Sequence, residues 1–227
     1  MKMKKYTISI FLILLLVSCG KKYKEPTDLE LRFDINKAPT VDGQLTFSEG
    51  HFIMNRIDFE GKREKGDDVS FSRSFDNGLT IPFDLNTAVP DLNFMVPQGV
   101  YTELSLAFDT KEEGASPCIL VDGTYTYSGG GTVPMRFEFD DSEEYEVEAE
   151  AEDGGQIVLD ADLLSRAKVV LDPTHWFQVV PTSHFESASL TDVDGTMTML
   201  INKNKNEEIF DLILDRIDES TEAVFNY

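Results

Sequence analysis

The sequence predicts an all-β protein, built as an antiparallel β-sandwich with one or two short helices near the C-terminus. About ten short segments alternate apolar and polar residues with a period of two, which is the pattern of strands that bury one face. Turn residues separate these segments, and helical spacing is nearly absent before residue 172. Many short strands with frequent turns are typical of a sandwich, in which two sheet faces share one core.

The N-terminus has the pattern of a secretory signal. An apolar run at residues 8–17, interrupted only by Ser9, follows the basic residues Lys2, Lys4 and Lys5. The run of ten residues is too short to span a bilayer core, which needs about 20. A basic start followed by a short apolar core predicts export across a membrane.

The end of this signal, Leu16-Val17-Ser18-Cys19, resembles the lipobox of bacterial lipoproteins, with Gly20 after the cysteine. The resemblance implies that residues 1–18 are removed, that the Cys19 thiol takes a diacylglyceryl group, and that the new amino terminus takes an acyl chain such as palmitate. Only a thiolate is nucleophilic enough near neutral pH for this reaction. The alternative is an ordinary signal peptide with a chance cysteine. A lipid on Cys19 implies an outer-membrane anchor, facing either the cell surface or the periplasm.

Charge excludes one class of function. Loss of residues 1–18 removes three Lys and no acid, which moves the formal net charge from −22 to −25. Nucleic acid repels such a body, so we expect no nucleic-acid partner. If Cys19 carries lipid, no intrachain disulfide forms, because Cys118 is the other of the two cysteines. Cys118 begins an apolar run, so we expect a buried thiol.

Residues 19–27 contain Lys21, Lys22 and Lys24 without periodicity, and we expect them to form a flexible tether. Residues 28–227 then form one domain. Strands are expected at 29–35, 45–59, 69–75, 79–85, 104–108, 118–127, 133–139, 144–152, 157–159 and 168–171. Within 45–59 the apolar phase slips at Asn55-Arg56, which predicts a bulge or a turn. Asn77-Gly78 and residues 96–99 are expected to be turns.

The clearest alternation runs along residues 144–152, where glutamates occupy every even position. Carboxylates are calcium ligands, but side chains two apart on a strand are roughly 7 Å apart, and a flat row does not surround a cation. We therefore expect a solvated face that discourages edge pairing. Turn roles are likewise expected for Asp160, Asp162, Asp192 and Asp194 and for the Asn202, Asn204 and Asn206 group.

The C-terminal part changes in character. Asp172 is a predicted N-cap with Pro173 at the first helical position, and Trp176 and Phe177 are expected on the inner side of that helix. A strand is expected at 195–201, then a helix capped by Asn206 with apolar residues at helical spacing. Residues 224–225 are expected to end the fold as a strand.

The turn Val96-Pro97-Gln98-Gly99-Val100-Tyr101 and the segment Asp172-Pro173…Trp176-Phe177 resemble uncharacterised β-sandwich lipoproteins of Bacteroidota. Some of those proteins are similar to domains with transthyretin-like topology, and others to fimbrillin-type surface proteins. The resemblance implies a transthyretin- or immunoglobulin-like sandwich with a surface or periplasmic role in binding or structure. It carries over no catalytic residue.

No catalytic, cofactor-binding or metal-binding residue is predicted. His51, His175 and His184 lack the i, i+4 spacing of a zinc protease, and no nucleophile elbow or phosphate-binding loop is present. Aromatic pairs, Trp176 with Phe177 and Tyr125 with Tyr127, could stack on sugars, although core packing is the expected role.

These observations favour a non-enzymatic, lipid-anchored envelope protein that binds a glycan or an envelope protein, or has a structural role. The alternative is a glycan-acting hydrolase with paired carboxylates, which requires a cleft that brings two acids together. A third reading is a fimbrillin-like surface subunit, which requires a donatable terminal strand; residues 224–225 are short for that role.

Overall fold

The computed structural model describes residues 25–40, 42–111, 117–162 and 165–225. The lipobox, Cys19 and residues 19–24 of the predicted tether lie outside these ranges. The described strands are β1 (Pro26–Ile35), β2 (Leu45–Arg63), β3 (Val69–Pro82), β4 (Asn93–Pro97), β5 (Gly99–Thr110), β6 (Ile119–Thr126), β7 (Thr132–Phe139), β8 (Glu144–Ala151), β9 (Ile157–Leu159), β10 (Ser165–Leu171), β11 (Thr191–Val193), β12 (Thr196–Ile201) and β13 (Glu222–Phe225). The described helices are the 3₁₀ turn η1 (Pro90–Leu92) and the α-helices α1 (Pro173–Phe177), α2 (Thr182–Ser187) and α3 (Glu207–Leu214).

The all-β class is confirmed, but the expectation of a purely antiparallel sheet is wrong. The strands form one 13-stranded mixed sheet in the order β11-β12-β7-β6-β2-β5-β8-β13-β10-β1-β4, with β3 on β2 and β9 on β5. Three pairs are parallel: β1 with β10, β12 with β7, and β13 with β8. Three short α-helices follow residue 172 instead of one or two, because α2 carries no cap signal that the sequence pattern could reveal.

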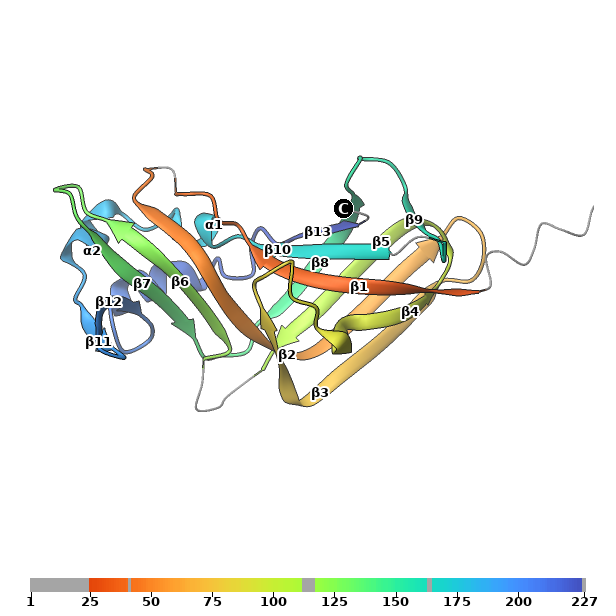
Figure 1. The fold of residues 1–227 in the computed structure, drawn as a ribbon, viewed down its shortest axis with the longest axis horizontal. Helices are drawn as coiled ribbons and strands as arrows, with labels where there is room; N and C mark the ends of the chain where they lie inside the picture. Colours follow the sequence, from red (N-terminus) through yellow and green to blue (C-terminus); the bar gives the residue numbers. More distant parts are fainter. Residues whose placement is uncertain (1–24, 41, 112–116, 163–164, 226–227) are drawn as a thin grey trace, which may run out of the picture.

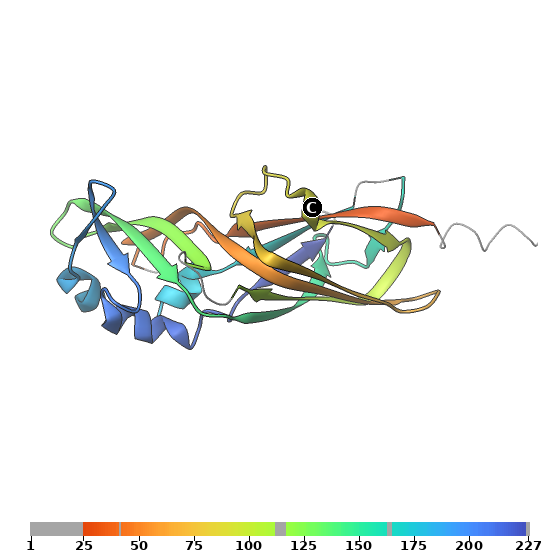
Figure 2. The same ribbon diagram turned by 90° about the horizontal axis from the view of Figure 1, so that it is seen from below.

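The long strand β2 divides the sheet into two lobes (Figure 1). Its first half pairs with β6 and its second half with β5. The helical lobe contains the first half of β2 with β6, β7, β12 and β11, and the α-helices lie along one side of this sheet (Figure 2). The rolled lobe contains the second half of β2 with β3, β5, β8, β13, β10, β1 and β4. β1 begins at Pro26, so the strand includes the last two residues, 26–27, of the predicted tether.

The rolled lobe closes through side chains at its two free edges, β3 and β4. The rings of Phe71 on β3 and Phe94 on β4 have centroids 5.1 Å apart. Arg73 on β3 donates a hydrogen bond of 2.7 Å to the carbonyl oxygen of Asp91, just before β4. The sheet therefore curls into an incomplete barrel whose inner face is apolar.

The predicted phase slip in β2 is confirmed as a register shift between Met54 and Arg56. On the partner strand, Leu79 faces Met54 and Ser74 faces Arg56, so several residues of β3 oppose one residue of β2. Asn77-Gly78 lies in this irregular part of β3, so the prediction of a hairpin turn at these residues is wrong. The two strands expected at 69–75 and 79–85 are one strand that ends at Pro82.

The two lobes share one continuous core of buried side chains. In the rolled lobe, Phe108 stacks on Tyr145 at 4.8 Å and contacts Phe33 and Phe52. In the helical lobe, the Phe137 ring contacts Trp176, Phe177 and Phe210. Aromatic side chains bury large apolar areas, so these two ring clusters supply a major part of the driving force for folding.

The first α-helix forms as its sequence predicts. The Asp172 side chain accepts a hydrogen bond of 3.1 Å from the backbone N–H of His175, and Pro173 occupies the first turn. Trp176 and Phe177 are buried, as expected. The predicted helix after Asn206 is also present as α3, although the Asn206 side chain bonds Ser189 and Leu200 instead of capping the helix.

Strand β8 lies inside the sheet and not at an edge. Residues Glu144 to Glu148 pair with β5, and residues Ala149 to Ala151 pair with β13. Its alternation is confirmed, because Tyr145 and Val147 are buried while the glutamates between them are exposed. The glutamate row is therefore a solvated face, as expected.

Candidate binding groove

An open groove of about 910 Å³ lies on the outer face of the rolled lobe. It crosses β3, β2, β5 and β8. The inner face of the same strands carries buried residues such as Phe59, Leu106 and Val147. Because residues alternate between the two faces of a strand, the residues between them, such as Glu60, Ser105 and Glu146, line this groove.

The register of the strands sets the shape of the groove. Asp58 on β2, Ala107 on β5 and Glu146 on β8 lie in one row across the sheet. The next row places Glu60 opposite Ser105 and Ser105 opposite Glu148. Short side chains on β5 thus form the floor, with a column of carboxylates on each side.

Both basic residues in the groove are already paired. Arg56 contacts Asp58 with N–O 2.7 Å apart and donates to the Ser72 hydroxyl at 3.1 Å. Lys62 forms an ion pair with Glu103, which raises the pKa of the lysine. Within the described residues, no ion-pair partner is found for Glu60, Glu144, Glu146 or Glu148, so the groove carries uncompensated negative charge.

One carboxyl beside the groove residues Arg56 and Glu144 is perturbed. Asp109 on β5 lies directly opposite Glu144 on β8. Partial burial raises the pKa of Asp109, the nearby negative charge of Glu144 raises it further, and Arg56 opposes the shift.

The structure does not bring the three histidines together. His175 Nε2 lies 2.9 Å from Glu219, and His184 lies 3.9 Å from Glu208. Burial lowers the pKa of His51, which lies near Asp122 and Arg136. In the parts of the chain that the structure describes, no group of three or more His, Cys, Asp or Glu side chains is placed to hold a metal ion.

The candidate sugar-stacking pairs do not form open platforms. Trp176, Phe177 and Tyr125 are buried, and Tyr127 is partly buried with its ring against Tyr125. These aromatic residues pack the core of the helical lobe.

The second acidic group has the local bonds of turns. The Asp192 carboxylate accepts a hydrogen bond of 2.7 Å from the Gly195 backbone, and Asp160 accepts one from Asp162. Asn202 accepts a comparable bond from Asn204. The expected turn roles are therefore present.

Cys118 is a buried free thiol, as predicted. Its Sγ lies 3.3 Å from the carbonyl oxygen of Phe139. Burial is the main cause that raises the pKa of this thiol to about 11, so we expect little of the reactive thiolate near neutral pH.

The groove was not visible to sequence reasoning, because it depends on which residues of four strands lie side by side. The one available signal was the row of glutamates on β8, which forms one wall. Comparisons with protein-family models, curated proteins and solved structures find no match. None of the helices in the described ranges has the length and apolar character needed to cross a membrane.

Proposed function

We propose that this chain is a lipid-anchored protein of the bacterial outer membrane that acts as a non-enzymatic binding or structural module. The lipobox at Cys19 supports the anchor. The groove across β3, β2, β5 and β8 is the observation that carries the binding role, since it offers an open, charged surface on a packed sheet. Its ligand, a glycan or an envelope protein, contacts the carboxylate columns.

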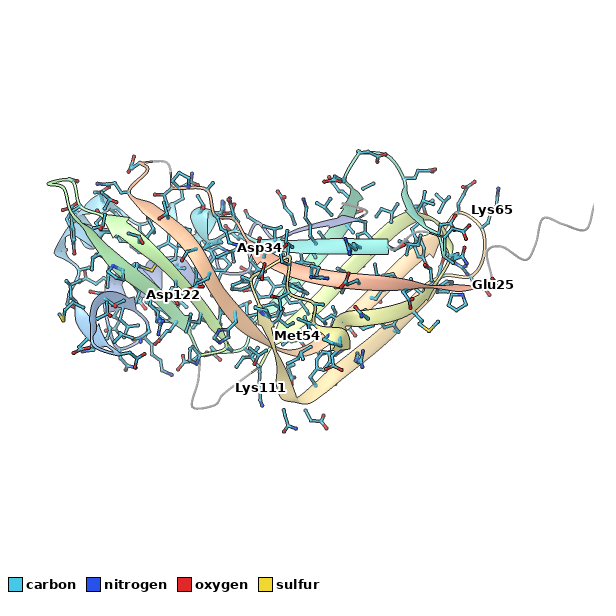
Figure 3. All side chains as sticks on the ribbon, in the orientation of Figure 1. Glu25, Asp34, Met54, Lys65, Lys111 and Asp122 are labelled. Atoms are coloured by element: carbon cyan, nitrogen blue, oxygen red, sulfur yellow. The ribbon has the colours of Figure 1, made fainter. Side chains whose placement is uncertain are left out.

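The position of Glu25, near the end of the predicted tether, fits this arrangement. The Glu25 carbonyl accepts a hydrogen bond of 3.2 Å from the backbone N–H of Gln98, in the turn between β4 and β5. In Figure 3, Glu25 and Lys65 lie together at one end of the molecule, whereas Asp122 lies in the helical lobe. An anchor at Cys19 would leave the groove and the helical lobe in the aqueous phase.

Membrane fractionation and protease shaving of intact cells test this proposal. We expect the wild-type chain in the membrane fraction and the Cys19→Ala variant in the soluble fraction. Digestion of the wild-type protein by added protease would place it on the cell surface, and protection would place it at the periplasmic face. Equal membrane retention of both chains would overturn the anchor.

The type of sandwich belongs to the same proposal. We assign the rolled lobe to a transthyretin- or immunoglobulin-like sandwich. The support is that the apolar inner faces of β2, β5 and β8 pack against those of β1 and β10. Phe33 of β1 contacts Phe108 of β5 across this core. An experimental structure with the same strand pairing and sheet packing would support the assignment.

A glycan-acting hydrolase is the second candidate, favoured by the Asp109 and Glu144 pair. Directly opposed residues have Cβ atoms about 5 Å apart, and retaining glycosidases hold their two carboxyls about 5 Å apart. Asp109, with its raised pKa, would be the acid and Glu144 the nucleophile. Release of sugar by the wild-type protein, lost in both Asp109→Asn and Glu144→Gln, would favour this candidate over the binding role.

The fimbrillin-like reading has less support. Its donatable strand would be β13, which is paired on one side with β10 and on the other with β8. Release of this strand would open the centre of the sheet.

A further inference from the structure

The groove lies on a sheet face whose central carboxylate side chains, Glu60, Glu146 and Glu148, are exposed to solvent. We propose that this face docks an extended, cationic polypeptide segment with basic side chains at alternate positions. This inference rests on the binding role proposed above and names the class of partner.

Charge complementarity selects a cationic partner. The groove is lined by seven acidic residues, Asp58, Glu60, Asp68, Glu103, Glu144, Glu146 and Glu148, and by two basic ones, Arg56 and Lys62. Each basic residue is paired with an acid of the same groove. The remaining carboxylates repel an anionic ligand and attract a cationic one, most strongly at low ionic strength.

Spacing selects an extended segment. Glu144, Glu146 and Glu148 follow one another at alternate positions of β8, which places neighbouring carboxylates roughly 7 Å apart. An extended peptide presents alternate side chains at the same interval, so lysines at every second position match the row. A compact cation can meet only one or two of these groups.

The cross-section of the groove suits one strand. β5 separates β2 from β8, so the carboxylate columns on those two strands are about 10 Å apart. In the two rows across the sheet, the outward-facing residues of β5 are Ser105 and Ala107, which form the floor between the columns. A peptide backbone can lie over these short side chains while its basic groups reach both columns.

The lining disfavours a glycan as the main ligand. Phe71 is the single aromatic side chain in the lining, and its ring is stacked on Phe59 at 5.0 Å. The groove thus lacks the exposed aromatic faces that stack on sugar rings, while its charge suits a basic peptide.

Equilibrium binding of two synthetic peptides to the full-length lipidated protein in detergent tests the inference. One peptide alternates Lys and Thr, and the other has the same composition with all lysines grouped. We expect tighter binding of the alternating peptide and weakening of its binding with added salt. The variant Glu144→Gln/Glu146→Gln/Glu148→Gln should bind it about tenfold more weakly, since three exposed ion pairs are lost.

A matched variant, Glu207→Gln/Asp211→Asn/Asp215→Asn, removes the same formal charge around α3 in the helical lobe and should keep wild-type affinity. Thermal unfolding of both variants establishes that each is folded. Absence of peptide binding overturns the inference, as does equal loss in the two variants or equal affinity for the two peptides, because either shows attraction to overall charge alone. Binding of spermine without binding of peptide also overturns it.

Membrane fractionation of the wild-type and Cys19→Ala proteins tests the lipid anchor separately. Failure of the peptide assay with a membrane-bound wild type removes only the partner class. Peptide binding by a protein that is not anchored removes the anchor and leaves the groove assignment standing.

Discussion

The Tyr125 hydroxyl of β6 donates a hydrogen bond of 2.9 Å to the carboxylate of Glu186 on α2. The same oxygen accepts a bond of 2.8 Å from the Ser128 backbone N–H in the turn after β6. Glu186 therefore ties the helix that the sequence did not predict to the sheet beneath it.

This tie predicts a pH effect. The Ser128 N–H bond, with the Tyr125 bond, lowers the pKa of Glu186. A lowered folded-state pKa gives stability that is present above the unfolded value, about 4.3, and is lost as the pH falls through the folded value. Glu186→Gln should lose this part of the acid dependence. Unfolding by urea at several pH values measures it, and identical acid profiles for the two proteins would contradict the assignment.

The Trp176 side chain is fully buried, and its indole N–H donates to the Glu219 carbonyl at 3.3 Å. Trp176→Ala should lower the free energy of unfolding by about 3–5 kcal/mol, because it removes a large apolar side chain and leaves a cavity. Denaturant unfolding measures this loss. The control Met197→Ala, on an exposed side chain of β12, should change stability by less than about 0.5 kcal/mol.

Asp172 has two structural bonds. It caps α1 through the His175 N–H and accepts a bond of 3.0 Å from the Asn36 side chain. Asp172→Ala should cost about 1 kcal/mol or more, since the cap is lost and the Asn36 amide loses its partner. Asp172→Asn should retain much of the cap. Equal stability of the Ala variant and wild type, measured by thermal unfolding, would show that the cap contributes nothing.

The Cys118 thiol should resist labelling in the folded protein. In the Cys19→Ala chain it is the one cysteine left, so a maleimide reports on it alone. We expect slow labelling near neutral pH and fast labelling in denaturant, since the thiol is buried and its pKa is raised from 9.0 to about 11. Between pH 9.0 and about pH 11 the thiol is deprotonated in the unfolded chain but still protonated in the folded one. The free energy of unfolding therefore falls as the pH rises through this range. Rapid labelling without denaturant would contradict the burial.

Asp109→Asn should be neutral or stabilising at neutral pH. Burial and the charge of Glu144 raise the pKa of Asp109, so its ionised form is disfavoured in the folded state. The wild-type protein therefore gains stability from this group as the pH falls through the raised value. The amide removes the repulsion and the associated pH dependence. A clear loss of stability in Asp109→Asn at neutral pH would show that the charge has a favourable partner.

Features encoded along one strand could be predicted from the sequence. The alternation around β1 and β8 identified strands and their buried faces, and the phase slip before Arg56 identified the irregularity in β2. Asp172-Pro173 identified the start of α1. Each of these signals is complete within a few neighbouring residues, where sterics and side-chain polarity act directly.

Features that depend on distant pairing could not be predicted. Nothing in residues 222–225 indicates that they pair between residues 149–151 and 167–170. Asn77-Gly78 has a turn-forming sequence, but tertiary pairing with β2 overrides that preference and holds it within β3. The groove requires Asp58, Ala107 and Glu146 to lie in one row, which only the strand registers establish.

The interior position of β13 has a consequence for the order of events during folding. Residues 222–225 supply the strand between β8 and β10, so the sheet of the rolled lobe remains interrupted until that part of the chain has been synthesised. Until then the facing edges of β8 and β10 are open to other strands, and such edges are prone to intermolecular pairing. The growing chain therefore passes through a stage at which aggregation competes with completion of the sheet.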